Sequence, residues 1–471
     1  MFYCKINDVI LNMHPSASSF IARSKEKAFD LKHRATINFN IGKYNLAVPR
    51  GKSQFQNIEL ASQMAKNAKW NAIEHLDAML LEFEKKITEN GAKVIWAEDA
   101  GEALQEIGKI CREKECRTIV KSKSMVTEEI HLNKFLEENG IESVETDLGE
   151  YIQQMDDEPP YHIVTPAMHK SKEEIAALFA EKLGVEENLP PSELTLVARN
   201  VLRKKFAEAS VGITGANFIV SDIGGIAITE NEGNARLSVS LPETTIVVAG
   251  IEKVIPSMDD LELFWPLLST FGTGQFVTAY NTLITGPKQK KEADGPAEMY
   301  VILLDNGRTN LLANEKVREA LYCIRCGACL NACPVYKNIG GHSYETTYSG
   351  PIGSIITPHL RGMKEFKHLS YASSLCGNCT EVCPVRINLH ELLLENRAES
   401  VYEGYTDFSE RAMWKVWKTA TLRRKTYNMG SGALKNAFVN RFFKAWTQYR
   451  GDLDFAPKTF NEMWREKNRK K

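Results

Sequence analysis

The sequence contains the stretch Cys323-Ile-Arg-Cys326-Gly-Ala-Cys329-Leu-Asn-Ala-Cys333-Pro334. Its spacing, C-x2-C-x2-C-x3-C-P, is the bacterial pattern for binding a [4Fe–4S] cluster. Three thiolates spaced in this way lie on one tight loop and can bind three irons of a cubic cluster. The fourth cysteine, which precedes proline, points toward a second cluster. The stretch therefore predicts a redox centre with two clusters.

A second motif follows the same spacing but begins with serine: Ser373-Ser-Leu-Cys376-Gly-Asn-Cys379-Thr-Glu-Val-Cys383-Pro384. The usual exchange of the fourth cysteine between two such motifs predicts the ligands of both clusters. These are Cys323, Cys326, Cys329 and Cys383 for cluster one, and Cys333, Cys376 and Cys379 for cluster two. Three alternatives exist for the fourth corner of cluster two. The Ser373 oxygen binds the iron, water binds it, or the site holds only three irons. We expect [4Fe–4S] for cluster one and [4Fe–4S] or [3Fe–4S] for cluster two.

Structural zinc is the alternative, because paired C-x2-C motifs also bind zinc. Zinc takes four ligands per site and has no need of a triple run followed by Cys-Pro. The other cysteines, Cys4, Cys111 and Cys116, are scattered along the chain. Scattered cysteines are usually small core residues, and we predict that role for these three.

Composition excludes several classes of protein. The chain has 471 residues, of which 43% are hydrophobic, and a net charge of -1, which argues against a general nucleic-acid binder. No apolar run reaches the roughly 18 residues of a membrane helix, and the first residues lack a signal-peptide layout. Clustered cysteines without a secretory signal predict a reducing cytosol. The second methionine, Met13, is an alternative start to Met1.

Strand-like and helix-like segments alternate from about residue 56, which predicts an α/β fold with a mostly parallel sheet covered on both faces. Single helices are expected over 57–89 and 125–139, and strands over 93–96, 118–120, 143–146, 162–165, 244–249 and 299–304. We expect four parts: an N-terminal extension (1–55), an α/β domain (56–311), a helical two-cluster domain (312–405) and a basic helical C-terminal region (406–471).

Two segments of the α/β domain are candidate binding sites. Lys121-Ser-Lys-Ser124 joins a strand to a helix, where an anion can bind; alternatively Ser124 caps the helix and the lysines are solvated. Glu230, Glu232 and Arg236 either face a pocket at the end of the sheet or belong to a polar hairpin loop. No motif indicates a nucleotide or flavin, and the ten histidines show no ligand spacing.

The C-terminal region is basic and aromatic. Residues 411–450 contain ten Lys or Arg, no Asp or Glu, and aromatic residues that include Trp414 and Trp417. Basic amphipathic helices lie on anionic membranes or acidic partners. This predicts peripheral contact with the inner face of the membrane. The alternative is that the helices pack on the acidic remainder of the same chain.

These features together resemble the lactate utilization protein B family. The resemblance covers about residues 17 to 450 and rests on both cysteine motifs and on several other stretches. These are Val120–Glu129, Glu145-Thr-Asp-Leu-Gly-Glu150, Gly212–Asn217, Asn231–Arg236, Thr285-Gly-Pro287, Asp294-Gly-Pro296, Asp305–Arg308 and Gly350-Pro-Ile-Gly353. Two positions depart from the family pattern: some relatives have cysteine in place of Ser373, and relatives often have histidine in place of Tyr300.

The resemblance implies a LUD domain, with a fold similar to phosphosugar isomerases and CoA transferases, followed by a two-cluster ferredoxin module. It also implies two partners, a cysteine-rich protein resembling heterodisulfide reductase subunits and a second LUD protein, in oxidising L-lactate to pyruvate. We therefore expect an electron-transfer subunit. The alternative is a LUD domain that is itself catalytic or ligand-sensing, with structural or regulatory clusters.

The metal content can be tested directly. After anaerobic reconstitution, the protein should contain iron and acid-labile sulfide in cluster proportions. Zinc without labile sulfide would contradict the redox interpretation.

Overall fold

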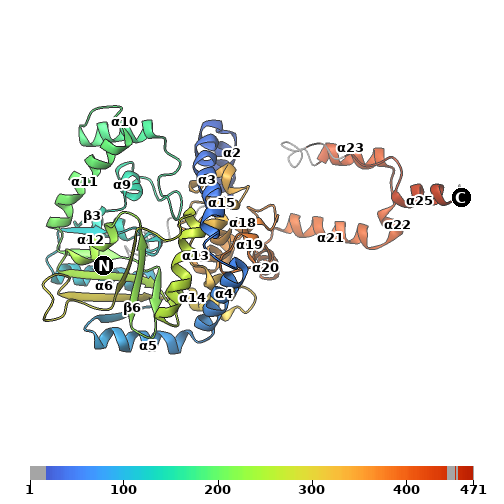
Figure 1. The fold of residues 1–471 in the computed structure, drawn as a ribbon. Coiled ribbons are helices and arrows are strands. Elements are labelled where there is room, and N and C mark those ends of the chain that lie inside the picture. Colours follow the sequence, from blue (N-terminus) through green and yellow to red (C-terminus); the bar gives the residue numbers. More distant parts are fainter. Residues whose placement is uncertain (1–16, 443–450, 452–453, 470–471) are drawn as a thin grey trace. The chain divides into compact units, whose positions relative to one another are not determined.

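The computed structural model describes residues 17–442, 451 and 454–469 (Figure 1). The chain forms two compact units, one that ends at Ser400 and one that begins at Val401. Residues 1–16, with Cys4 and the two candidate starts, lie outside the described residues. Each unit is described by itself below.

The first unit is built on a six-stranded, fully parallel sheet. Side chains of its central strands alternate between two hydrophobic clusters: Ile246 and Val248 lie in one, and Val247 and Ala249 in the other. The predicted parallel sheet with both faces covered is confirmed. In spatial order the strands are β1 (Lys93–Ala97), β10 (Glu298–Leu304), β7 (Thr244–Gly250), β4 (Val211–Thr214), β2 (Thr118–Lys121) and β3 (Glu142–Glu145).

A second, four-stranded mixed sheet follows β4 in the chain. Its hairpin pairs β5 with β6 antiparallel. Its order is β8 (Val254–Ile255), β5 (Phe218–Val220), β6 (Gly225–Glu230) and β9 (Tyr280–Ile284).

Helices cover the sheets, and two of the expected long helices are broken. The helix expected over 57–89 ends at Glu74 and starts again at Leu76. The helix expected over 125–139 is interrupted where His131 adopts a positive φ of 54°. The helices of this region are α4 (Ile58–Glu74), α5 (Leu76–Glu89), α6 (Ala100–Glu113), α7 (Met125–Glu129), α8 (Leu132–Glu138), α9 (Leu148–Met155), α10 (Lys172–Leu183), α11 (Pro191–Glu208), α12 (Asn234–Ser240) and α13 (Leu261–Thr273).

The prediction of a strand over 162–165 is wrong. The segment is a loop, because the buried Nδ1 of His162 accepts hydrogen bonds from the backbone N–H groups of Val164 (3.1 Å) and Thr165 (3.3 Å). Because these N–H groups donate to the His162 side chain, they are not available for hydrogen bonds with a neighbouring strand.

The cysteine-rich part is helical and continues directly from β10. Two N-terminal helices, α2 (Ala17–Phe29) and α3 (Leu31–Lys52), pack against it; Asn38 donates to the carbonyl of Lys337 at 3.0 Å, and the ring of Phe20 lies 5.8 Å from that of Tyr344. Its elements are α14 (Arg308–Ala313), η3 (Arg318–Tyr322), α15 (Ala328–Ala332), α16 (Tyr336–Ile339), η4 (His342–Tyr344), α17 (Gly350–Arg361), α18 (Met363–Ser370), α19 (Asn378–Glu381) and α20 (Leu389–Tyr402).

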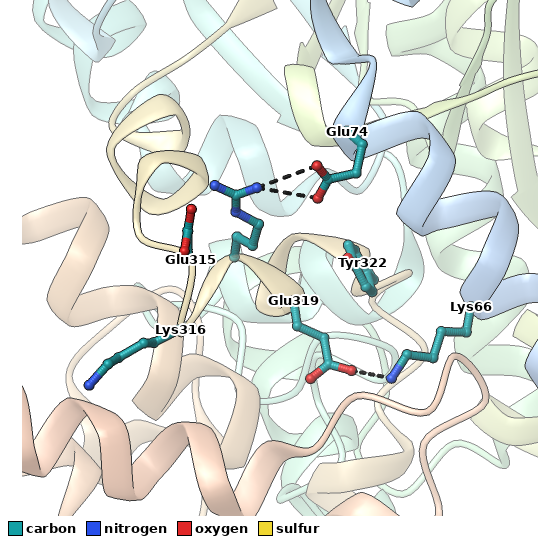
Figure 2. A pocket seen from close by; sticks show the side chains of 7 residues that line it. Lys66, Glu74, Glu315, Lys316, Glu319 and Tyr322 are labelled. Carbon is teal, nitrogen blue, oxygen red and sulfur yellow. Dashed lines mark hydrogen bonds and ion pairs between the residues drawn. The ribbon is translucent and has the colours of Figure 1, made fainter.

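Ion pairs attach the cysteine-rich part to α4 of the α/β domain. Figure 2 shows a shallow pocket between α4 and η3, where Lys66 pairs with Glu319 and Arg318 lies 3.3 Å from Glu74. Both pairs are partly exposed, and so is the pocket. We therefore interpret the pocket as the place where α4 contacts η3 and not as a ligand site.

A buried ionic network forms a second connection. The Arg308 guanidinium binds both oxygens of Glu129 (2.9 and 2.8 Å) and one oxygen of Glu252 (2.5 Å). Arg325, inside the first cysteine motif, lies 3.3 Å from the other oxygen of Glu252, and the Tyr348 hydroxyl donates to Glu129 at 2.6 Å. Although burial alone would raise it, Arg308 and Arg325 lower the pKa of Glu252 to about 2.

The second unit consists of helices joined by short irregular segments, and its described residues form no strand. No residue of α21 is buried, and the rings of Trp414 and Trp417 meet edge-on at 5.6 Å. Among the helices that the structure describes, none is long and apolar enough to cross a membrane. The elements are α21 (Phe408–Leu422), α22 (Arg424–Tyr427), α23 (Gly432–Phe442) and α25 (Phe460–Arg469).

The buried network predicts a large effect on stability. Glu129→Gln removes one charge that faces the buried Arg308, and we expect the free energy of unfolding to fall by about 3–5 kcal/mol. Lys316→Gln is the control, because its ion pair with Glu395 is exposed and should contribute about 1 kcal/mol or less. Chemical denaturation measures both variants; equal losses would contradict the role of the network.

Candidate metal centre

Four of the cysteines line one small cavity. They are Cys323, Cys326, Cys329 and Cys383, the set predicted for cluster one. The other walls are apolar and include Ile163, Ile352 and Ile387. The structure therefore brings Cys383, from the second motif, to the three sulfurs of the first motif. An apolar, thiol-lined cavity suits an iron–sulfur cluster, because its sulfides need few polar partners beyond backbone N–H groups.

The ligands predicted for cluster two differ in their burial. Cys333 and Cys379 are buried, whereas Cys376 is exposed. The Asn378 side chain, beside Cys379, donates to the carbonyl of Ala332, beside Cys333, at 2.9 Å. That hydrogen bond joins the two motifs beside Cys333 and Cys379, two of the predicted ligands of cluster two.

The two motifs repeat one backbone conformation. Arg325 and Leu375 stand at equivalent positions and have φ values of 61° and 53°, while Gly327 and Gly377 have 80° and 79°. Positive φ turns the chain tightly enough to direct successive cysteines to one side of the loop, and glycine adopts it without strain.

Ser373 occupies the place of Cys323 in this repeated loop. The Arg325 N–H donates to the Cys323 sulfur at 3.4 Å, and the Leu375 N–H donates to the Ser373 hydroxyl oxygen at 3.1 Å. The serine side chain thus has the orientation of the cysteine that it replaces.

The sulfur spacing is too wide for mononuclear zinc. Tetrahedral zinc with Zn–S bonds of about 2.3 Å places its sulfurs about 3.8 Å apart. Within the described part of the chain, no three cysteine sulfurs lie within 4.8 Å of one another. The four sulfurs nevertheless share one cavity, so the site fits a larger, multi-iron group.

Burial makes free thiolates costly at this centre. Burial, followed by the neighbouring Cys383 and Cys323, raises the pKa of Cys326, and burial raises the pKa of Cys383 to about 12. Burial also raises the pKa of Cys379 to about 11, with Cys333 and Cys376 as its charged neighbours. The cysteines that raise one another's pKa are therefore members of the same predicted cluster. Only a bound cation would keep such thiolates charged at neutral pH.

A larger cavity of about 500 Å³ adjoins the first cysteine motif. Cys326 and Arg325 form part of its wall. Gly272 of α13 packs closely there, since an added Cβ would lie 3.0 Å from the Cys326 carbonyl. The opposite wall comes from loops at the carboxyl ends of β2, β4 and β7, so the LUD-like part and the cysteine motif share one cavity.

The candidate residues of the α/β domain lie in three different places: the cavity, the core (Lys121) and the exposed surface (Arg236). Lys123, Ser124, Glu230 and Glu232 line the cavity, whereas Lys121 and Arg236 are not among the lining residues. Ser124 also caps α7, as one of the two interpretations predicted. The segment of Glu230 and Glu232 continues into α12, so it is not a simple hairpin loop.

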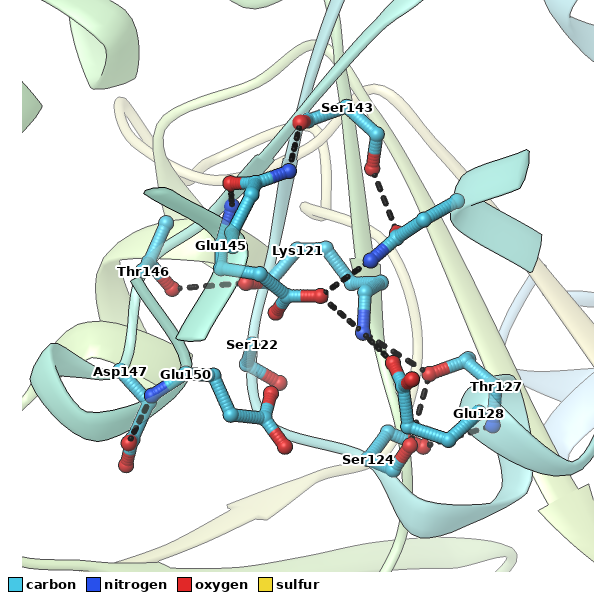
Figure 3. Close-up of polar contacts among 12 residues, drawn as sticks. Lys121, Ser122, Ser124, Thr127, Glu128, Ser143, Glu145, Thr146, Asp147 and Glu150 are labelled. Carbon is cyan, nitrogen blue, oxygen red and sulfur yellow. Dashed lines mark hydrogen bonds and ion pairs between the residues drawn. The ribbon is translucent and has the colours of Figure 1, made fainter. Parts of the chain in front are cut away.

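Lys121 is a structural residue. Figure 3 shows its ammonium group between Glu145 (2.6 Å), Glu128 (2.9 Å) and the Thr127 hydroxyl (3.1 Å). Although burial alone would lower it, these carboxylates raise the pKa of Lys121. The lysine is therefore charged and paired within the core, away from the cavity.

Sequence reasoning missed two cations on the wall of this cavity, Arg325 and Lys253. Arg325 has 11% of its side chain exposed, and its Nη1 has no partner within the described residues. Lys253 follows β7, and burial together with Arg325 lowers its pKa to about 8. Arg325 was visible as the one charged residue inside the first motif; no pattern marked Lys253.

The histidines also contain one group that the sequence did not indicate. Glu158, His169 and His342 have potential ligand atoms within 4.8 Å of one another. Lys170, however, lies 2.9 Å from the same Glu158 carboxylate and already neutralises it. The burial of Cys111 and Cys116 agrees with their predicted role as core residues.

Three family models match the chain in succession. They describe a LUD domain (residues 80–304), a 4Fe-4S dicluster domain (319–387) and the C-terminal part of lactate utilisation protein B (401–469). The chain therefore consists of a LUD domain, a helical iron–sulfur region and a helical C-terminus. A solved DUF162 family protein from Deinococcus radiodurans has 15% identity and a TM-score of 0.26, covering 49% of this chain and 98% of its own, which is too low to inform the fold.

Curated relatives match most of the chain. "Lactate utilization protein B" of Bacillus velezensis is 48% identical over 369 residues, covering 78% of this chain and 77% of the relative. The proteins of the same name from Bacillus subtilis (46%; 80% and 78% covered) and Geobacillus thermodenitrificans (44%; 87% and 88% covered) are similar. The chain belongs to the lactate utilization protein B family.

Proposed function

We propose that the protein is the electron-transfer subunit of a complex that oxidises L-lactate to pyruvate. Membership of the family supports a role in lactate utilization, and the dicluster domain supports iron–sulfur clusters. In this proposal Cys323, Cys326, Cys329 and Cys383 bind cluster one, and Cys333, Cys376 and Cys379 bind cluster two. When bound, such clusters accept and release single electrons.

The different positions of Cys326 and Cys376 carry the proposal. Cys326 forms part of the wall of the LUD cavity, whereas Cys376 is exposed. A chain that transfers electrons between an internal site and a partner needs one group of ligands near each. Backbone N–H groups of Arg325, Tyr336 and Ile387 donate to cysteine sulfurs at 3.4–3.5 Å, and such donors set the reduction potential.

Two kinds of partner fit the proposal. We infer that the chain works with a cysteine-rich protein resembling heterodisulfide reductase subunits and with a second LUD protein, as the family resemblance implies. We also infer peripheral contact of the C-terminal unit with the inner face of the membrane. The exposed Trp414 and Trp417 on α21, in a region rich in Lys and Arg, support that contact.

A second candidate function belongs to the LUD domain. A cavity lined by charged groups and by Cys326 favours a catalytic or ligand-sensing site that communicates with cluster one. The clusters would then have a regulatory or structural role.

The electron-transfer role can be tested in the purified complex. Addition of L-lactate under anaerobic conditions should reduce the clusters, as measured by electron paramagnetic resonance. D-lactate is a matched control. Clusters that dithionite reduces but lactate in the complete complex does not would contradict the role.

The fourth corner of cluster two can be tested separately. We propose a [4Fe–4S] cluster with a non-cysteine or exchangeable corner at Ser373. Ser373→Cys should supply a fourth thiolate, so the variant should retain more iron in air and lose any [3Fe–4S] signal. Ser374→Cys is the control, because it places the thiol one residue away. Equal behaviour of the two variants would contradict a ligand position at 373.

A further inference from the structure

The cavity of the LUD domain lies where ligands bind in open parallel sheets. Strands β2 and β4 are neighbours, but the chain continues from β2 outward to β3 and from β4 to β7 on the other side. This reversal opens a crevice at the carboxyl ends of β2 and β4. Ser122 and Ser124 after β2, and Gly215 and Asn217 after β4, line the cavity.

Two cations on its wall are incompletely paired. The Nη1 atom of Arg325 is buried and has no hydrogen-bond partner, and the Lys253 ammonium group makes no hydrogen bond or ion pair with any residue that the structure describes. The Arg325 guanidinium stacks 4.7 Å from the Tyr348 ring, which holds its plane in place. A fixed guanidinium with a free N–H is suited to binding a carboxylate.

Arg325 has a single, shared carboxylate partner among the described residues. Glu252 lies 3.3 Å from Arg325, and its other oxygen is bound by Arg308. The other carboxylates of the cavity wall, Asp147, Glu230 and Glu232, accept hydrogen bonds from backbone N–H groups. A buried guanidinium N–H without a partner is costly, which favours an acceptor at this place.

We propose that the cavity binds a small organic acid, with its carboxylate against Arg325 and Lys253 beside the first cysteine motif. The inference deepens the second candidate function and rests on it. The cavity wall also carries the Ser122 hydroxyl and the carboxylates of Asp147 and Glu232, each of which is hydrogen-bonded within the chain. The cavity volume is within the usual range for small-molecule sites.

The thiolates of cluster one are the competing explanation of the same cations. Cys323 lies close enough to interact with Lys253 and Arg325 electrostatically. If Arg325 and Lys253 only stabilise the thiolates of cluster one, neutralising Lys253 would shift the reduction potential of the cluster. Pyruvate binding would then be unchanged. The experiment therefore measures binding and the cluster separately.

Pyruvate is the probe, titrated by calorimetry into the anaerobic, oxidised, cluster-loaded full chain. We expect saturable binding that Lys253→Gln weakens at least tenfold and that Lys291→Gln, an exposed charge outside the cavity, leaves unchanged. The neutral pyruvamide should bind at least tenfold more weakly than pyruvate to the unmodified protein. Iron content and the resonance spectrum verify that each variant retains its clusters.

Three results would overturn the inference: no saturable binding at millimolar pyruvate, pyruvamide binding as tight as pyruvate, or equal affinity of Lys253→Gln and the unmodified protein. The pyruvamide comparison uses the unmodified protein, so it still tests the inference if the Lys253→Gln variant loses its clusters. Reduction of the clusters by lactate in the complex is measured independently. The anion site and the electron-transfer role can therefore fail separately.

Discussion

The buried guanidinium of Arg308 is the interaction on which the arrangement of the site depends. It holds Glu129 of the α/β domain and Glu252 after β7 in one network, and Glu252 in turn contacts Arg325 inside the first cysteine motif. Because buried charges must be paired, this network allows few alternative positions of the motif relative to the sheet. The cysteine loop is thereby held at the edge of the sheet where parallel α/β domains bind ligands.

This position gives the two cysteine groups different surroundings. The group around Cys326 lies in an apolar cavity and forms part of the wall of the LUD cavity, whereas Cys376, in the other group, is exposed. In the proposed electron-transfer role, the group beside the cavity would exchange electrons there and the exposed Cys376 would face a partner. The repeated loop conformation, with serine in place of one cysteine, makes the two groups chemically unequal as well.

Sequence patterns were most reliable where the structure is local. The alternation of strand-like and helix-like segments predicted the parallel sheet, because a helix between two strands returns the chain to begin the next strand in the same direction. The prediction failed for 162–165, where the His162 side chain takes the backbone donors that a strand would use. It also failed to separate Lys121 from Lys123. These lysines are two residues apart, but Lys121 points into a carboxylate cluster and Lys123 toward the cavity.

The cysteine loops follow from the sequence alone, because three ligands within seven residues and a glycine at positive φ are properties of a short segment. The family and the order of the domains follow from the sequence as well. Packing of the folded chain, and no sequence pattern, places Cys326 at the LUD cavity and brings Arg325 and Lys253 to its wall. These residues come from segments about 70 positions apart, and their proximity follows from packing and buried charge, which no local spacing encodes.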